Sequence, residues 1–127
     1  MKKIIILFTV AFALLSCYGQ EKKVELVAPA AFDKKINEDK GQVIDVRTPK
    51  EYKAGHIEGA VNMHVYDKDF TTRLDSLDKN TTVYVYCKAG GRSAEAMQTM
   101  KEKGFIHIVE LDGGTDAWIE AGKPLKQ

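Results

Sequence analysis

Residues 81–104 read TTVYVYCKAGGRSAEAMQTMKEKG, which is a β-rich run, a glycine-containing loop and a helical run in direct succession. The first six residues are dense in threonine, valine and tyrosine, and this composition favours a strand. From residue 93 to residue 103, small and apolar side chains recur at helical spacing, and Gly104 supplies a C-terminal stop. A strand that passes through a short loop into a helix is the repeating unit of an α/β fold.

The rest of the chain continues this alternation. Thr48 and Glu51 form a predicted capping box with Pro49 at the first helical position, so a helix begins there, and Gly55 keeps it short. Strands are predicted at residues 24–27, 42–46, 60–63 and 106–111, and helices at 30–39, 70–77 and 115–121. We therefore expect an α/β domain with a small parallel sheet and helices on both faces. Because runs 81–86 and 106–111 mix apolar and polar residues, the ends of the sheet should be partly exposed.

Length and composition restrict the functional classes. The chain has 127 residues, which suits one domain, and 19 basic against 18 acidic residues leave a net charge of +1. That balance gives no electrostatic reason to bind nucleic acid, so no nucleic-acid partner is expected. A hydrophobic share of 44% with 29% charged residues is typical of a globular protein. The two cysteines, Cys17 and Cys87, are too few for a disulfide framework.

The N-terminus has the layout of an export signal. Lys2 and Lys3 precede a run from Ile4 to Leu15 in which Thr9 is the only polar side chain. A bilayer-spanning helix needs about 20 apolar residues, so the run is too short to be one. Two lysines before a short apolar core are typical of a secretory signal. We expect residues 1–16 to be the signal, 17–23 a tether and 24–125 the working domain.

The sequence Leu14-Leu15-Ser16-Cys17 resembles the lipobox of bacterial lipoproteins, in which the cysteine becomes the lipidated N-terminus. This resemblance implies a periplasmic or cell-envelope protein that is held at the membrane by a lipid on Cys17. A cut after Gly19 or Gln20 would instead release a soluble exported protein. An uncleaved membrane helix is the third alternative.

The loop after the strand at 81–86 carries the predicted chemistry. In open α/β sheets, ligand sites lie at the carboxyl ends of the strands, and Cys87 is the first residue there. Gly90 and Gly91 permit the positive φ angles with which a loop curls round a sulfur atom. The backbone N–H groups of such a loop, with the following helix N-terminus, form an anion nest and stabilise a thiolate over a thiol.

Two cations complete the predicted site. Arg92 lies five residues after Cys87, where its guanidinium fork can hold an oxyanion in bidentate fashion, and Lys88 adds a second positive charge. We therefore predict Cys87 as the nucleophile. The predicted substrate-binding residues are those of the rest of the loop: Lys88, Ala89, Gly90, Gly91, Arg92 and Ser93. Lys88 is equally compatible with a solvated loop charge, and Ser93 with a helix N-cap.

Three stretches resemble the rhodanese family of sulfurtransferases. Residues 45–62, DVRTPKEYKAGHIEGAVN, are similar to the N-terminal signature of the family, except that Glu58 stands where members often carry proline. The loop from Cys87 to Ser93 is similar to the family's active site. LDGG at 111–114, with the Ala117-Trp118 pair and AGKP at 121–124, is similar to its C-terminal signature. The ordered set spans nearly all of the chain after the signal.

The resemblance implies a rhodanese-like fold and a ping-pong reaction. The Cys87 thiolate would take a sulfane sulfur from thiosulfate or a similar anionic donor, become a persulfide, and pass the sulfur to cyanide or a thiol acceptor. No metal or organic cofactor is implied. A persulfide-carrying or partner-docking module without fast turnover is the alternative. In related phosphatases and arsenate reductases the arginine follows the cysteine by six positions, which makes room for a tetrahedral phosphate. Here Arg92 follows Cys87 by five, which fits a ring sized for one sulfur atom.

Other polar residues are predicted to be structural. Asp45, Arg47 and Glu51 are interpreted as an ion-pair and hydrogen-bond cluster at the sheet edge. The three histidines, His56, His64 and His107, lack the mutual spacing of metal ligands, so no metal site is expected. Trp118 is assigned to the packing of the last helix.

Overall fold

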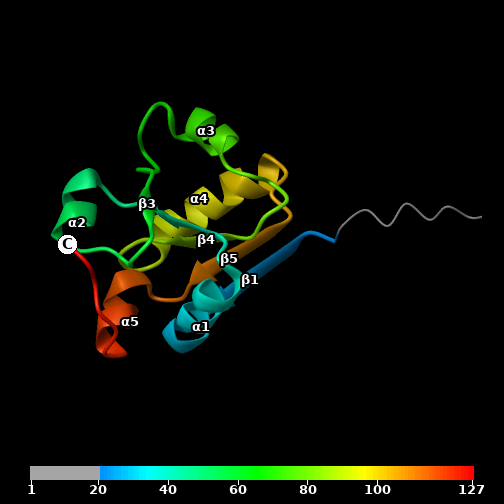
Figure 1. Cartoon of the computed structure of the whole chain (residues 1–127). Helices are drawn as coiled ribbons and strands as arrows, with labels where there is room; N and C mark the ends of the chain where they lie inside the picture. Colours follow the sequence, from blue (N-terminus) through cyan, green and yellow to red (C-terminus); the bar gives the residue numbers. More distant parts are fainter. Residues whose placement is uncertain (1–20) are drawn as a thin grey trace, which may run out of the picture.

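The computed structural model describes residues 21–127, so the predicted signal and Cys17 lie outside the described residues. Five parallel strands form one sheet in the order β1-β5-β4-β2-β3 (Figure 1). The strands are β1 (Lys23–Val27), β2 (Gln42–Asp45), β3 (Val61–Asn62), β4 (Val83–Tyr86) and β5 (His107–Leu111). Within residues 21–127, no helix has the length and apolar character that crossing a membrane requires.

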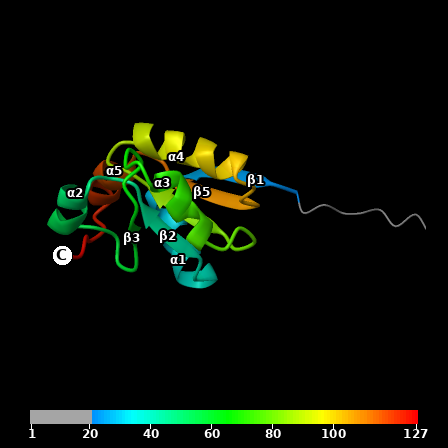
Figure 2. The ribbon, with the colours of Figure 1, turned by 90° about the horizontal axis from the view of Figure 1, so that it is seen from above.

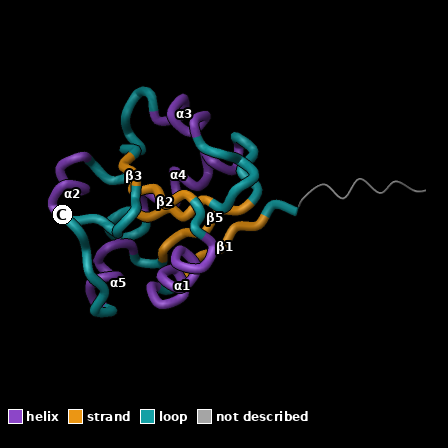
Figure 3. The backbone as a smooth tube through the Cα atoms, in the orientation of Figure 1, coloured by secondary structure: helices purple, strands orange, loops and turns teal. Residues whose placement is uncertain are grey.

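Helices cover both faces of this sheet. They are α1 (Pro29–Asp39), α2 (Pro49–Ala54), α3 (Phe70–Arg73) with the 3₁₀ turn η1 (Leu74–Ser76), α4 (Gly91–Glu102) and α5 (Gly114–Glu120). In Figure 2, α4 runs along one side of the sheet and α1 along the other. The tube in Figure 3 shows the strands in the middle with helices around them. The predicted α/β class and parallel sheet are therefore confirmed.

Two apolar clusters hold the layers together, because alternate residues of each strand point to opposite faces. On one face, Ile44, Val85 and Ile108 pack with Ala96 and Met100 of α4. On the other face, Val43, Tyr84 and Val109 pack with Phe32 of α1 and Trp118 of α5. The packing role predicted for Trp118 is confirmed.

The prediction of partly exposed ends holds at the amino-terminal ends of runs 81–86 and 106–111, where Thr81, Thr82, Ile106 and His107 are only partly buried. Every residue of β4 is buried, and the polar groups on these strands are satisfied inside the protein. The Tyr84 hydroxyl donates to Asp39 at 2.7 Å, and the Tyr86 hydroxyl accepts from the Ile57 N–H at 3.0 Å. Burial raises the pKa of both tyrosines above the ordinary phenol value, so both stay neutral. The edges of the sheet are exposed as well, and Leu26 of β1 is 61% exposed.

The local sequence patterns predict where α2 begins more accurately than where α1 ends. The capping box forms as predicted: the Glu51 N–H donates to Thr48 Oγ1 at 3.2 Å, and the Thr48 N–H donates to Glu51 Oε1 at 3.3 Å. However, α1 ends with Lys40 in the left-handed conformation, not with Gly41. A Cβ on Gly41 would lie 2.6 Å from the Thr82 carbonyl oxygen, so this glycine permits a close approach to the chain before β4.

The carboxyl ends of the three central strands meet at one edge of the sheet, as a parallel arrangement requires. The segments that leave β2, β4 and β5 there contain Arg47, Cys87 and the pair Gly113-Gly114, respectively. The three stretches that carry the sequence resemblance are therefore neighbours in space.

Candidate active site

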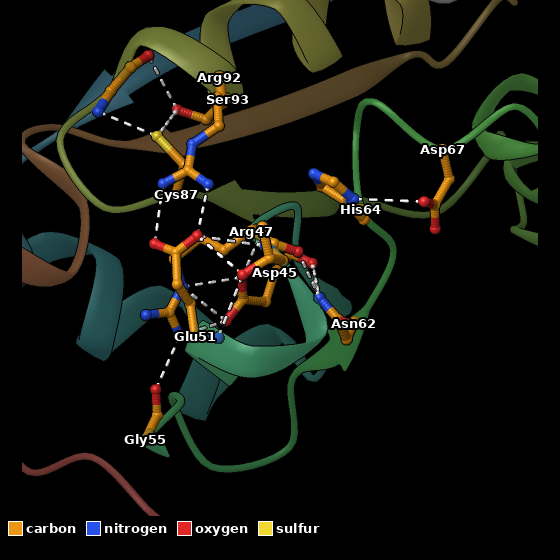
Figure 4. Close-up of polar contacts among 12 residues, drawn as sticks. Asp45, Arg47, Glu51, Gly55, Asn62, His64, Asp67, Cys87, Arg92 and Ser93 are labelled. Atoms are coloured by element: carbon orange, nitrogen blue, oxygen red, sulfur yellow. Dashed lines mark hydrogen bonds and ion pairs between the residues drawn. The ribbon is translucent and has the colours of Figure 1, made fainter. Parts of the chain in front are cut away.

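Cys87 lies directly after β4 and is almost entirely buried, with 1% of its surface exposed. The Gly90 N–H donates to Cys87 Sγ at 3.0 Å, and Cys87 Sγ donates to Ser93 Oγ at 3.4 Å (Figure 4). The loop thus curls round the sulfur, as its spacing predicts. An N–H aimed at a sulfur atom favours the negatively charged form of that atom.

The first residues of α5 hold the beginning of the Cys87 loop in place through backbone hydrogen bonds. The Thr115 N–H donates to the Cys87 carbonyl at 2.9 Å, and the Asp116 N–H donates to the Lys88 carbonyl at 3.0 Å. A Cβ on Gly114 would collide with the Cys87 carbonyl oxygen, which explains the glycine at that position. In a trans peptide the N–H points opposite to the carbonyl, and no peptide among residues 21–127 is cis. The N–H groups of Lys88 and Ala89 therefore point away from α5.

Only one of the two loop glycines uses its conformational freedom. Gly90 has a φ of +123° and precedes the first residue of α4. Gly91 is already helical, so α4 begins two residues earlier than predicted and Ser93 is not its N-cap. Lys88, Ala89 and Gly91 are exposed, while Arg92 is partly buried.

The guanidinium of Arg92 is bound to a carboxylate. Its Nη1 lies 2.6 Å from Glu51 Oε1 and its Nη2 lies 2.9 Å from Glu51 Oε2, which is a bidentate pair (Figure 4). Hydrogen bonding to Arg92 lowers the pKa of Glu51 to about 2, with further help from Thr48. The prediction that Glu51 belongs to the Asp45–Arg47 cluster is therefore wrong, because α2 presents Glu51 to the loop.

Lys88 has a carboxylate partner as well. Its Nζ lies 2.9 Å from Asp116 at the start of α5, and both side chains are more than half exposed. Both cations predicted to attract an anion are therefore paired within the protein. The exposed pair of Lys88 and Asp116 exchanges readily with solvent ions, because such a pair is worth only about 0–1 kcal/mol.

A second ion pair, between Arg47 and Asp45, lies close to the site and is almost entirely buried. Arg47 Nη2 lies 2.6 Å from Asp45 Oδ2, and the side chains are 6% and 0% exposed. Arg47 also donates to the Gly55 carbonyl at 2.7 Å, and Asn62 donates to the Arg47 carbonyl at 2.8 Å. These bonds tie β2, the end of α2 and β3 together. The structural role predicted for Asp45 and Arg47 is confirmed.

Ser93 connects the cysteine to a buried carboxyl group that sequence reasoning missed. Ser93 is fully buried and its hydroxyl donates to Glu110 Oε1 at 2.7 Å, with the Gly90 carbonyl as a second acceptor at 3.1 Å. Glu110 is 6% exposed, and burial raises its pKa. One signal was available: residues 106–111 read IHIVEL, where an acid interrupts the apolar end of a strand.

The histidines have local partners. His56 stacks on Tyr52 with ring centroids 3.8 Å apart, and His107 contacts Glu25 at 2.7 Å. His64 lies 3.3 Å from Asp67. These contacts agree with the structural roles predicted for them.

A surface cavity of about 240 Å³ adjoins the loop. Glu51 and Lys88 line it together with Asp116, Ile119 and Leu125. Glu51, the partner of Arg92, and both members of the Lys88–Asp116 pair therefore border this space, and Arg47 lines it as well.

Comparison with known proteins gives a consistent result. Residues 28–121 match the rhodanese-like domain. The chain is 39% identical over 75 residues to the thiosulfate sulfurtransferase PspE of Escherichia coli, covering 58% of this chain and 70% of PspE. It is 34% identical to the putative sulfur carrier protein YrkF of Bacillus subtilis, covering 69% of this chain but 47% of YrkF. A crystal structure of a rhodanese-related protein from Thermoplasma volcanium superposes with a TM-score of 0.71 at 28% identity, covering 80% of this chain and 97% of that one.

Proposed function

The chain belongs to the rhodanese-like domain family, and from this membership we propose that it is a sulfurtransferase that carries a sulfane sulfur on Cys87. The observation that carries the proposal is the hydrogen bond from the Gly90 N–H to Cys87 Sγ, with a length of 3.0 Å. It lies inside a loop that runs from Cys87 to Arg92, five residues further along the chain. A ring of this size encloses a sulfur atom and leaves an oxyanion at its rim. The names of PspE and YrkF, a thiosulfate sulfurtransferase and a putative sulfur carrier, are in keeping with it.

The first half-reaction loads the cysteine. The Cys87 thiolate attacks the outer sulfur of thiosulfate, and a new sulfur–sulfur bond forms. The bond between that sulfur and the sulfonate breaks, and its electron pair leaves with sulfite. The outer sulfur of the resulting persulfide carries the negative charge, which the loop N–H groups stabilise.

Arg92 binds the donor by exchanging one partner for another. Its fork already holds two carboxylate oxygens of Glu51, and two sulfonate oxygens of thiosulfate present a similar pair of acceptors. The pair is partly exposed, with side chains at 23% and 29%, so the exchange does not require a buried charge to be uncovered. Lys88 at the neighbouring rim, whose pair with Asp116 is more than half exposed, adds a weaker, hydrated positive charge.

The second half-reaction unloads the cysteine. Cyanide or a thiolate acceptor attacks the outer sulfur, the persulfide bond breaks, and its electrons return to Cys87 as the thiolate. Because the donor product leaves before the acceptor arrives, the kinetics are of the ping-pong type. The residues of the loop suffice for both steps, so the proposal includes no metal or organic cofactor.

A second function, a persulfide carrier or docking module with slow turnover, is favoured by one observation. Cys87 is 1% exposed, so a bulky acceptor reaches its sulfur only if the rim opens. Phosphatase or arsenate reductase chemistry is less well supported, because the loop is one residue shorter than those reactions use.

The test is turnover with thiosulfate and cyanide. The native protein should form thiocyanate, and Cys87→Ser should form none. Loss of hydrolysis of an aryl phosphate on Cys87→Ser would favour a phosphatase instead. A native protein that gains one sulfur atom on Cys87 yet forms negligible thiocyanate would favour the carrier. Undiminished thiocyanate formation by Cys87→Ser would contradict the proposed mechanism.

We also propose that the protein is exported and held at the membrane by a lipid on Cys17, since Lys2, Lys3, the apolar run and the Leu14–Cys17 sequence support it. Mass spectrometry of the N-terminal fragment from the cell envelope should find Cys17 as the first residue with acyl chains attached. A fragment that begins after Gly19 or Gln20 would contradict the anchor while keeping export. A fragment that begins at Met1 would contradict cleavage and the lipid anchor, and would favour the uncleaved membrane helix.

A further inference from the structure

Glu110 is a buried carboxyl group that has no role in the two half-reactions of the proposed sulfur transfer. It lies near the carboxyl end of β5, paired in register with Leu26 of β1 on one side and Val85 of β4 on the other. Its side chain is on the α4 face of the sheet, where Ser93 supplies its hydrogen bond. Burying a carboxyl group in such apolar surroundings costs free energy unless a hydrogen-bond partner compensates for the lost water.

The three side chains form one continuous hydrogen-bonded chain. Cys87 Sγ lies 3.4 Å from Ser93 Oγ, which lies 2.7 Å from Glu110 Oε1. Cys87 and Ser93 are fully buried and Glu110 is nearly so, which isolates this chain from bulk water. A proton that leaves the thiol therefore has a direct route inward through a hydroxyl group.

We propose that Glu110 is a positioning residue that stores the proton of Cys87 through Ser93, so that the thiol and the carboxyl group share one proton. This role rests on the proposed function, since sulfur transfer requires the thiolate. In the resting form, Cys87 carries the proton and Glu110 is a carboxylate. In the reactive form, Cys87 is a thiolate and Glu110 is a carboxylic acid.

The step between the two forms is balanced. The S–H bond of Cys87 breaks as a new O–H bond forms on Ser93, and the original O–H bond of Ser93 breaks as one forms on Glu110. The three residues together carry one negative charge before and after the transfer. The thiolate thus forms without a second negative charge beneath it, which would oppose ionisation in a buried site.

The surroundings of Glu110 favour the protonated carboxyl group. Burial raises its pKa, the hydrogen bond from Ser93 lowers it, and the charge of Asp112 raises it again. The register partners from β1 and β4 are the apolar Leu26 and Val85, and Ser93 of α4 is uncharged. Asp112 and, through Ser93, Cys87 are the ionisable groups that face it. The two cations of the loop, Arg92 and Lys88, are bound to Glu51 and Asp116 instead.

The test follows the alkylation of Cys87 by iodoacetamide as a function of pH, measured on the Cys87 peptide by mass spectrometry so that Cys17 does not contribute. Two groups that share a proton titrate in two macroscopic steps, so the rate in the native protein should rise in two steps. Glu110→Gln keeps an oxygen that accepts from Ser93 but cannot take a proton. Its rate should rise in a single step, with the second step lost.

Asp112→Asn is the matched control, because it removes the other nearby negative charge and leaves the hydrogen-bonded chain intact. It should retain both steps. A single step in the native protein, or two steps in Glu110→Gln, would overturn the proposal. If Glu110→Gln does not fold, the native protein alone still tests the proposal. The carboxyl ¹³C resonance of Glu110 should shift in two steps as the pH rises, and in a single step once Cys87 has been alkylated. A resonance that never follows the titration of Cys87 would also overturn it.

Alkylation needs neither sulfur donor nor acceptor, so this outcome is independent of turnover. Two steps without thiocyanate formation would contradict the proposed function and leave the proton coupling intact. Thiocyanate formation together with a single alkylation step in both the native protein and Glu110→Gln would contradict the proton coupling and leave the proposed function intact.

Discussion

Two arginine–carboxylate pairs lie next to each other on the same side of Cys87 (Figure 4), and they differ in their access to water. Arg47 and Asp45 are enclosed between β2, α2 and β3, with side chains 6% and 0% exposed. Arg92 and Glu51 lie at the rim of the loop, 23% and 29% exposed. Both pairs have short hydrogen bonds, so distance alone does not separate them. Burial does: a buried pair cannot exchange partners without stranding a charge, whereas a partly exposed pair can.

The comparison assigns stability to one pair and anion binding to the other. The enclosed pair holds three segments of backbone through Gly55 and Asn62, and the rim pair holds a guanidinium fork at the mouth of the loop. Substitutions in the two pairs should therefore affect different measurements.

The largest expected effect is on stability. Arg47→Met leaves Asp45 buried without its cation, so the free energy of unfolding should fall by about 3–5 kcal/mol in urea titrations. Removing both charges in Asp45→Asn/Arg47→Met should recover part of this loss. If Arg47→Met lost under about 1 kcal/mol, the pair would have to be regarded as exchangeable.

Arg92→Ala should affect turnover instead. Loss of charged hydrogen bonds to the donor should lower kcat/KM for thiosulfate by about 10- to 100-fold. The free energy of unfolding should fall by about 1–2 kcal/mol, less than for Arg47→Met, because Glu51 keeps its bonds to Thr48 and its access to water. A large loss of stability with unchanged kcat/KM would reverse the roles of the two pairs.

Glu51→Gln should weaken the side chain that competes with thiosulfate for the guanidinium of Arg92. Glutamine preserves the capping box with Thr48 but does not bind the guanidinium as an ion, so KM for thiosulfate should fall by about 2- to 5-fold. Steady-state kinetics at low salt measure this best. An increase in KM would mean that Glu51 aligns Arg92 for the donor and does not compete with it.

The same carboxylate has a defined pH signature. The pKa of Glu51 is lowered from 4.5 to about 2, chiefly by hydrogen bonding to Arg92. A lowered pKa adds stability that is complete above the unfolded value and is lost as the pH falls through the folded value. The difference in unfolding free energy between the native protein and Glu51→Gln should therefore shrink as the pH falls from 4.5 to about 2. A difference that is constant over this range would place the stabilisation elsewhere.

The smallest effect belongs to Lys88→Gln. Its pair with Asp116 is more than half exposed, so stability should change by less than about 0.5 kcal/mol. KM for thiosulfate should rise by no more than about 2-fold, since a hydrated charge adds little to binding. A tenfold rise would assign Lys88 a direct contact with the donor.

The sequence is sufficient for the fold class and for the position of the nucleophile, because both depend on local patterns. The strand before Cys87, the glycine that curls the loop and the Thr48 capping box each act within a few residues. The partners of Arg92 and Ser93 could not be predicted in this way. Glu51 and Glu110 lie 41 and 17 residues away in the chain, and only the parallel sheet brings them to the loop.

The mixed pattern predicts the partly exposed strand ends, but it does not show which polar residues inside the strands are buried. Alternation of polar and apolar residues indicates exposure only when the polar groups have no partner inside. Tyr84, Tyr86 and Glu110 each find one in a neighbouring segment, so these three residues are buried. The partner, not the pattern, decides whether such a residue is buried.

The central claim, that Cys87 accepts a sulfur atom from an anionic donor, is tested most directly by the mass of the intact domain after brief exposure to thiosulfate without acceptor. The native protein should gain the mass of one sulfur atom, located on the Cys87 peptide and removed by cyanide. Arg92→Ala should gain it more slowly and Cys87→Ser should not gain it. A native protein whose mass stays unchanged at saturating thiosulfate would contradict the account.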